Sequence, residues 1–154
     1  MRKMKINAAL FLLICFVLSA CGNRNIFFEY QPIPPEGWCM YSVRSFDIDI
    51  KNIEKTYNVY INVRHRPNYP FQNLWLFITE TAPNGIVSRD TIEIFLADHR
   101  GRWLGSGSGS VREMRVRIKQ DFYFPEAGTY RFDIQQGMRS EVLQGITEIG
   151  MQVN

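Results

Sequence analysis

The sequence predicts an all-β protein, an antiparallel β-sandwich of about eight strands with an immunoglobulin-like or jelly-roll-like arrangement. Apolar side chains recur at every second position in several segments after residue 37, as in strands with one buried and one wet face. Turn-forming residues separate these segments, and no amphipathic helical pattern occurs among them. Short alternating strands joined by tight turns are typical of a sandwich.

The strands follow in order from residue 26. The apolar residues 26–30 indicate a short edge strand, with contact at a membrane surface as the alternative, and the proline-rich residues 31–37 exclude helix. Alternating strands are expected over residues 46–50, 57–64, 91–96, 114–119 and 130–135. Residues 74–78 are apolar at every position, which predicts a central strand covered on both faces.

Three connections are recognisable between these strands. Asn84-Gly85 predicts a hairpin with a type I′ turn, which needs positive φ at both central residues. Residues 125–128 form a second turn. The Gly-Ser repeat at 105–110 is expected to be a flexible loop. It lacks the Lys-Ser/Thr ending and the following helix of a phosphate-binding loop.

The N-terminus predicts a bacterial lipoprotein. Residues 1–20 combine a cationic start, a short apolar run and small residues ahead of Cys21, the pattern of a lipoprotein signal peptide. We expect Cys21 to be the first mature residue and to carry the lipid. Its several acyl chains would anchor the protein far more firmly than a single chain. An ordinary secretory peptide with a cysteine at the cleavage site is the alternative. Residues 21–37 would then be the lipidated cysteine and tether, and residues 38–154 a single sandwich domain.

Removal of the signal changes the charge and the cysteine count. The full chain has 18 Lys and Arg against 15 Asp and Glu, and three of the basic residues lie in the signal. The mature chain is therefore near neutral, which gives no indication of nucleic-acid binding. Cys39 would be the one cysteine left without lipid, so no disulfide is expected.

No motif for catalysis, cofactor binding or metal binding is found. His65 and His99 are far apart, without further ligands at metal-binding spacing, and no serine lies in a nucleophile elbow. We therefore expect a protein that is not an enzyme.

Several residues are instead candidates for contact. Arg115 and Arg117 form a basic stripe, either a solvated strand face or a contact for an acidic partner. Trp75 and Phe77 share a strand face, with Tyr60 as an expected neighbour, and would form an exposed aromatic patch if the second sheet does not cover them.

Two further sites are predicted from local sequence. Trp103 is interpreted as a plug at one end of the sandwich, with a partner contact as the alternative. Thr91, in Asp90-Thr91-Ile92, fits a short motif that some bacteria O-glycosylate.

The ordered motifs of the mature chain resemble the gliding motility lipoprotein GldH family. Besides the signal ending at Cys21, the resemblance is carried by residues 69–74, 76–77, 96–105, 124–130, 136–139 and 143–150. Gly137 stands where that family more often has alanine.

The resemblance implies a non-enzymatic envelope component needed for surface gliding and linked to type IX secretion, without cofactor. Its expected partners are other motility or secretion proteins, and its expected location is the outer membrane, facing the periplasm. That location is also favoured because no acidic residue directly follows Cys21. The alternative is a carbohydrate-binding lipoprotein that docks glycans on Trp75, Trp103 or Tyr60.

Overall fold

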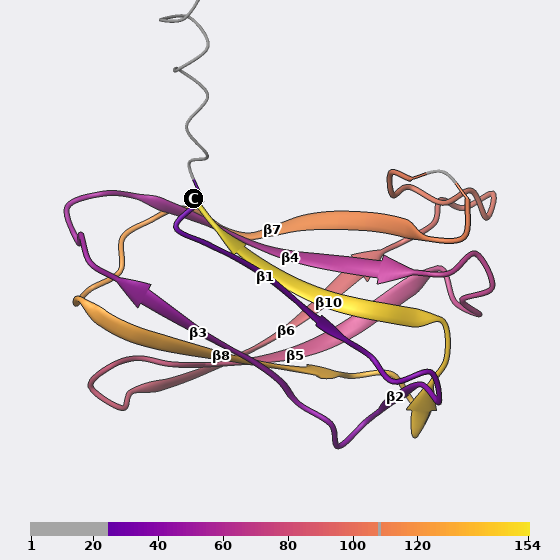
Figure 1. Ribbon diagram of the computed structural model, residues 1–154, viewed down its shortest axis with the longest axis horizontal. Helices are drawn as coiled ribbons and strands as arrows, with labels where there is room; N and C mark the ends of the chain where they lie inside the picture. Colours follow the sequence, from indigo (N-terminus) through magenta and orange to yellow (C-terminus); the bar gives the residue numbers. More distant parts are fainter. Residues whose placement is uncertain (1–24, 108) are drawn as a thin grey trace, which may run out of the picture.

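The computed structural model describes residues 25–107 and 109–154, and this part of the chain is all-β. Two four-stranded antiparallel sheets pack face to face around one core, and a two-stranded ribbon lies at one end (Figure 1). The predicted antiparallel sandwich is confirmed. The structure has ten strands in the described residues, where about eight were expected. The seven ranges named from the sequence all form strands, but the strand at Ile146–Val153 was not among them. The other two form the ribbon and have two residues each, which is too short to show periodicity.

The first sheet, here sheet I, has the order β1-β10-β4-β7, and the second, sheet II, has the order β3-β8-β5-β6. Sheet I comprises β1 (Phe27–Pro32), β10 (Ile146–Val153), β4 (Tyr57–His65) and β7 (Arg112–Phe122). Sheet II comprises β3 (Arg44–Ile50), β8 (Gly128–Gln136), β5 (Asn73–Thr81) and β6 (Val87–Phe95). The ribbon pairs β2 (Trp38–Cys39) with β9 (Val142–Leu143). The edge strand predicted at residues 26–30 is confirmed as β1, which pairs with β10 alone. Residues 27–32, which were expected to belong to the tether, are therefore part of sheet I.

The core is formed by the inner faces of both sheets. Alternating residues of β3, β4, β8 and β10 point inward and are almost completely buried. The largest fully buried side chains are aromatic: Trp38, Phe46, Phe124, Tyr130 and Phe132. The Trp38 indole N–H donates to the carbonyl of Ser42 at 2.8 Å, which satisfies its one polar group inside the core.

Strand β5 is central, as predicted, but the prediction that both its faces are covered is wrong. Leu74, Leu76 and Ile78 point into the core, whereas Trp75 is 37% and Phe77 47% exposed. Continuous apolar runs signal double coverage mainly in parallel sheets with helices on both faces. Here no described strand packs on the outer face of sheet II, so the apolar residues on that side remain partly exposed.

The hairpin between β5 and β6 is confirmed, but its predicted turn type is wrong. The Gly85 amide donates to the carbonyl of Ala82 at 2.9 Å, and Gly85 has φ 84° while Asn84 does not have positive φ. This is the arrangement of a type I turn followed by a glycine bulge. Pro83 favours this arrangement, because its ring fixes φ near −65°, which is the value that the first central residue of a type I turn takes.

Candidate interaction surfaces

The outer face of sheet II carries four exposed aromatic side chains, here called the aromatic face. Trp75, Phe77 and Phe95 point outward from β5 and β6, and Phe71 lies just before β5. The exposed fractions are 37% for Phe71, 37% for Trp75, 47% for Phe77 and 57% for Phe95. Isolated apolar residues are normal on a surface, but a cluster of large ones marks an interaction site.

A groove of about 380 Å³ lies beside Trp75. It is lined by Phe71, Asn73, Trp75, Gly137, Met138, Arg139 and Ser140. The Gly137 amide donates to the carbonyl of Trp75 at 2.7 Å, and the Trp75 amide donates to the Met138 sulfur at 3.3 Å. The groove therefore combines a tryptophan whose main chain is hydrogen-bonded on this side with a thioether and a guanidinium.

Gly137 also sets the position of Phe77. A Cβ at residue 137 would lie 3.1 Å from the Phe77 ring, closer than such contacts normally are. The alanine expected from the family pattern would push this ring outward by a few tenths of an ångström. The glycine of this chain thus lets Phe77 lie directly against the end of β8.

Thr91, the candidate glycosylation site, lies in the same area. It is exposed on β6 in register with Phe77, and its amide donates to the Asp90 carboxylate at 2.8 Å. A modification at Thr91 would therefore project from the aromatic face.

Tyr60, Arg115 and Arg117 lie on the opposite side of the molecule, on the outer face of sheet I. Tyr60 is in register with Arg117, and the Arg115 guanidinium lies 3.7 Å from the Tyr60 ring centroid. The expectation that Tyr60 neighbours Trp75 and Phe77 is therefore wrong, because β4 and β5 belong to different sheets.

Trp103 is half-buried, and its backbone pairs with Ala97 in an isolated bridge. Its ring packs against the core and lies 4.6 Å from the His65 imidazole, between ring centroids. The preceding turn is held by Asp98, whose carboxylate accepts the amides of Arg100 and Arg102, both at 2.9 Å. These hydrogen bonds, that from the Arg102 amide foremost, hold the pKa of the Asp98 carboxyl below its usual range.

His65 is a buried titratable group that the sequence did not single out. It is completely buried, its Nδ1 lies 3.1 Å from the carbonyl of Arg66, and its Nε2 has no hydrogen-bond partner within the described residues. Burial lowers the pKa of this imidazole, so the neutral ring is favoured. Over the described ranges, no three His, Cys, Asp or Glu residues come together as metal ligands.

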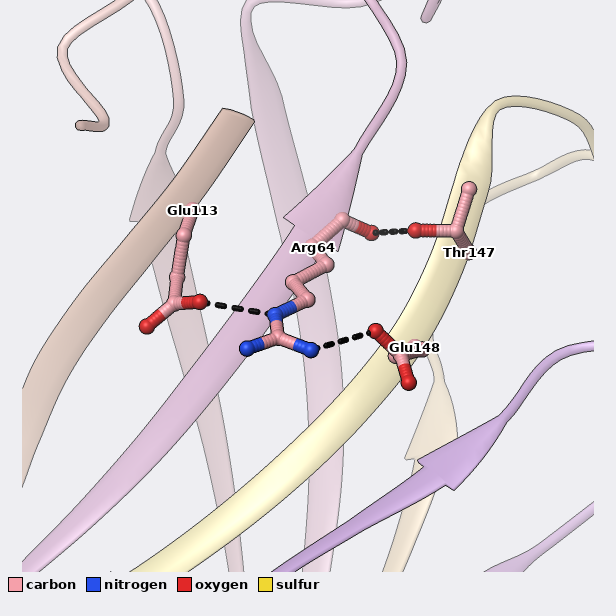
Figure 2. Close-up of polar contacts among 4 residues, drawn as sticks. All are labelled: Arg64, Glu113, Thr147 and Glu148. Atoms are coloured by element: carbon pink, nitrogen blue, oxygen red, sulfur yellow. Dashed lines mark hydrogen bonds and ion pairs between the residues drawn. The ribbon is translucent and has the colours of Figure 1, made fainter. Parts of the chain in front are cut away.

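A polar cluster centred on Arg64 joins the strands of sheet I (Figure 2). Arg64 Nε lies 2.7 Å from a Glu113 carboxylate oxygen, and Nη1 lies 2.8 Å from one of Glu148. The Thr147 hydroxyl donates to the carbonyl of Arg64 at 3.1 Å. The cluster thus connects β4 to β7 on one side and to β10 on the other.

Tyr30 extends this cluster to β1. The Arg64 guanidinium carbon lies 3.9 Å from the Tyr30 ring centroid, and the ring covers Gly150, where a Cβ would approach it to 2.6 Å. Burial, with Glu113 as the next cause, raises the pKa of the Tyr30 phenol to about 12. Sequence reasoning missed the cluster because its members come from four distant segments, and strand register cannot be read from any one of them.

The described residues include no helix that is long and apolar enough to cross a membrane. Cys21, the predicted lipidation site, lies outside the described residues.

Comparison with known proteins identifies the family. A family model described as GldH lipoprotein matches residues 25–153. The chain is 32% identical over 154 residues to the gliding motility lipoprotein GldH of Flavobacterium johnsoniae, covering 96% of this chain and 95% of the relative. It is also 32% identical over 151 residues to a gliding motility lipoprotein GldH homolog of Christiangramia forsetii, covering 94% and 92%. With the matched model and two near-full-length relatives, the chain belongs to the GldH lipoprotein family.

Proposed function

We propose that this chain is a non-enzymatic envelope lipoprotein of the gliding motility and type IX secretion machinery that acts as a protein-interaction module. The names of its relatives support the motility assignment. The observation that carries the interaction role is the aromatic face, four large apolar side chains exposed together on an uncovered sheet. Tryptophan and other aromatic residues dominate the binding energy of protein interfaces, which is why such a face favours a protein partner.

The groove beside Trp75 favours a protein over a glycan. Met138 adapts its shape to irregular apolar partners, and Phe71 adds a second apolar wall. Arg139 at the rim would pair with a carboxylate of the partner. The partner is therefore expected to insert an apolar side chain next to an acidic one.

Carbohydrate binding remains the second candidate, now at a smaller site. Trp75, Trp103 and Tyr60 do not share a surface, which argues against a platform made of all three. One tryptophan bordered by Asn73, Arg139 and Ser140 is nevertheless a suitable lining for a single sugar ring.

Site-specific crosslinking in the native host tests the proposal. A photoreactive amino acid at Phe77 should capture an envelope protein. The same probe at Asp47, which is on the outer face of the same sheet but two strands away from β5, should not. Trp75→Ser together with Phe77→Ser should abolish capture from a third probe at Phe95. Because both side chains are partly covered, a lower melting temperature is expected, and a far-UV circular dichroism spectrum like that of the parent would show that the variant is still folded. If the probes capture no protein and a purified envelope glycan binds saturably, carbohydrate binding would be favoured instead.

The proposed anchor gives a separate prediction. Replacing Cys21 with alanine should abolish incorporation of labelled palmitate and release the protein from the outer-membrane fraction, because the mature chain would lose its acyl chains. Cys39→Ala is the matched control and should retain label and location. Continued labelling of the Cys21 variant would contradict the anchor.

A further inference from the structure

Strand β7 has an open edge on sheet I. It pairs with β4 on one side and with no full strand on the other within the described ranges. Its inner side chains Met114, Val116 and Ile118 are only half-buried, whereas Ile61 and Val63 of the neighbouring β4 are completely buried. The apolar inner surface next to β7 is therefore incompletely covered.

A cavity of about 210 Å³ lies beside this edge, between the two sheets. It is lined by Ile78, Glu80, Ser88, Asp90, Ile118, Lys119 and Phe132. Ile78, Ile118 and Phe132 provide apolar walls, and the Lys119 ammonium lies 2.6 Å from the Glu80 carboxylate. The cavity is large enough to take one apolar side chain.

The cavity exists because β6 extends past the edge of sheet I. Ser88 and Asp90 share the inner face of β6 with Ile92 and Ile94, yet both are exposed, whereas Ile94 is buried. No described strand of sheet I lies opposite them. Sheet I is thus one strand short at this position.

The backbone of β7 is arranged to accept such a strand. Glu113 exchanges two hydrogen bonds with Ser106, both 2.8 Å, on the side away from β4. Because backbone groups alternate in direction along a strand, those of Arg115 and Arg117 point to the same side. Ser106 already occupies the first position of this edge, and the next two positions are open among the described residues.

The positive charge of β7 indicates what kind of segment would pair with its free edge. Arg115 and Arg117 are exposed, and neither forms an ion pair within the described part of the chain. Antiparallel pairing of two β7 strands would bring these arginines close together, which disfavours a second copy of this chain. Carboxylates on an added strand would instead complement them.

We propose that the free edge of β7 binds an extended acidic segment of a partner protein, which adds a fifth strand to sheet I. Carboxylates of the added strand on the outer face of sheet I lie beside Arg115 and Arg117. An apolar side chain of the same strand, on the inner face, enters the cavity next to Ile118. The backbone pairing of this second contact is on sheet I, whereas its cavity is shared by both sheets. The contact goes beyond the proposed function.

A synthetic peptide of alternating glutamate and valine, added to the full-length chain in detergent, tests this proposal. The peptide should bind saturably, and it should slow amide exchange at Arg115 and Arg117 with little change at Val116, whose amide already faces β4. A lysine–valine peptide should bind far more weakly. Equal binding of both peptides, or binding without protection of these two amides, would overturn the proposal, as would a dimer formed through β7.

Variants separate the charge from the backbone. Arg115→Ala with Arg117→Ala should weaken the acidic peptide by about tenfold and reduce its salt dependence. Lys55→Ala with Arg100→Ala removes the same charge from exposed loop positions outside the cavity and should leave binding nearly unchanged. Arg117→Pro should bind more weakly than Arg117→Ala, because proline lacks the edge amide but leaves the ladder to β4 intact. Equal effects of the two charge pairs would refute an edge-specific site.

Discussion

The indole of Trp103 lies tilted against the His65 ring and packs on the core, so we expect it to contribute to stability before binding. Removing a buried aromatic side chain costs about 3–5 kcal/mol, and a half-buried one somewhat less. Trp103→Ala should therefore lower the melting temperature by roughly 10 °C in a thermal scan. Arg115→Ala with Arg117→Ala is the control and should hardly move it, since solvated charges contribute little. A Trp103 variant that melts like the parent but loses partner capture would identify a binding site instead.

His65 gives a pH-dependent prediction. Its imidazole is buried, which lowers its pKa in the folded state below that in the unfolded chain. The unfolded chain therefore binds the proton more tightly, and this residue's contribution to stability is lost as pH falls below about 6.5. The free energy of unfolding, measured by denaturant titration from pH 7.5 to 5.5, should decrease for the parent and decrease less for His65→Phe. Parallel curves for the two proteins would show that His65 does not titrate on unfolding.

At the scale of elements, the Arg64 cluster holds β1, β10, β4 and β7 together on the outer face of sheet I. Arg64→Ala would leave Glu113 and Glu148 without their shared partner and the Tyr30 ring without its cation. We expect a loss of about 1–2 kcal/mol, more than for an isolated surface pair because three side chains depend on one guanidinium.

Hydrogen exchange locates this effect. Amides of the edge strand β1 should exchange faster in Arg64→Ala, while those of the central strand β5 in sheet II should change little. Lys51→Ala, which breaks only the exposed pair with Asp49, is the matched control and should affect neither strand. Uniformly faster exchange in both sheets would mean that the cluster stabilises the whole domain and not β1 in particular.

Most of the longer strands were predictable from the sequence, and their partners were not. The exception is β10, whose apolar residues do not alternate regularly, so it was not recognised as a strand. Alternation at Phe46–Ile50 or Tyr130–Gln135 depends only on neighbouring residues, so it gave the inner and outer faces correctly. Whether the outer face of β5 at Trp75 is covered depends on another element packing on that face, and the pattern of neighbouring residues carries no information about such an element. The turn at Asn84 was misjudged because Pro83, a local feature, outweighs the preference of the Asn-Gly pair.

The candidate contact surfaces were also predictable only in part. Trp75 and Phe77 were recognisable because both are large, apolar and two residues apart on one strand. Phe95 and the groove at Met138 required the register of β5 with β6 and the path of the chain after β8. The open edge of β7 required knowledge of which strand is missing, a property of the whole sheet.

For the whole molecule, the two proposed contacts lie on different sheets. The aromatic face belongs to sheet II, and the β7 edge belongs to sheet I. One lipoprotein could therefore hold two partners at once, because neither contact covers the other.

The position of β1 also determines how the domain carries mechanical load. At one end of sheet I, Phe27 of β1 pairs with Val153 of β10, and Val153 pairs with Val59 of β4. Val59 pairs in turn with Lys119 of β7, which forms an ion pair with Glu80 of β5. Trp75 lies five residues back along β5, roughly 17 Å away at ~3.3 Å per residue. Tension entering at the start of β1 and resisted at Trp75 is therefore directed along the strands. All six residue pairs between β1 and β10 are then loaded together in shear instead of being separated one after another.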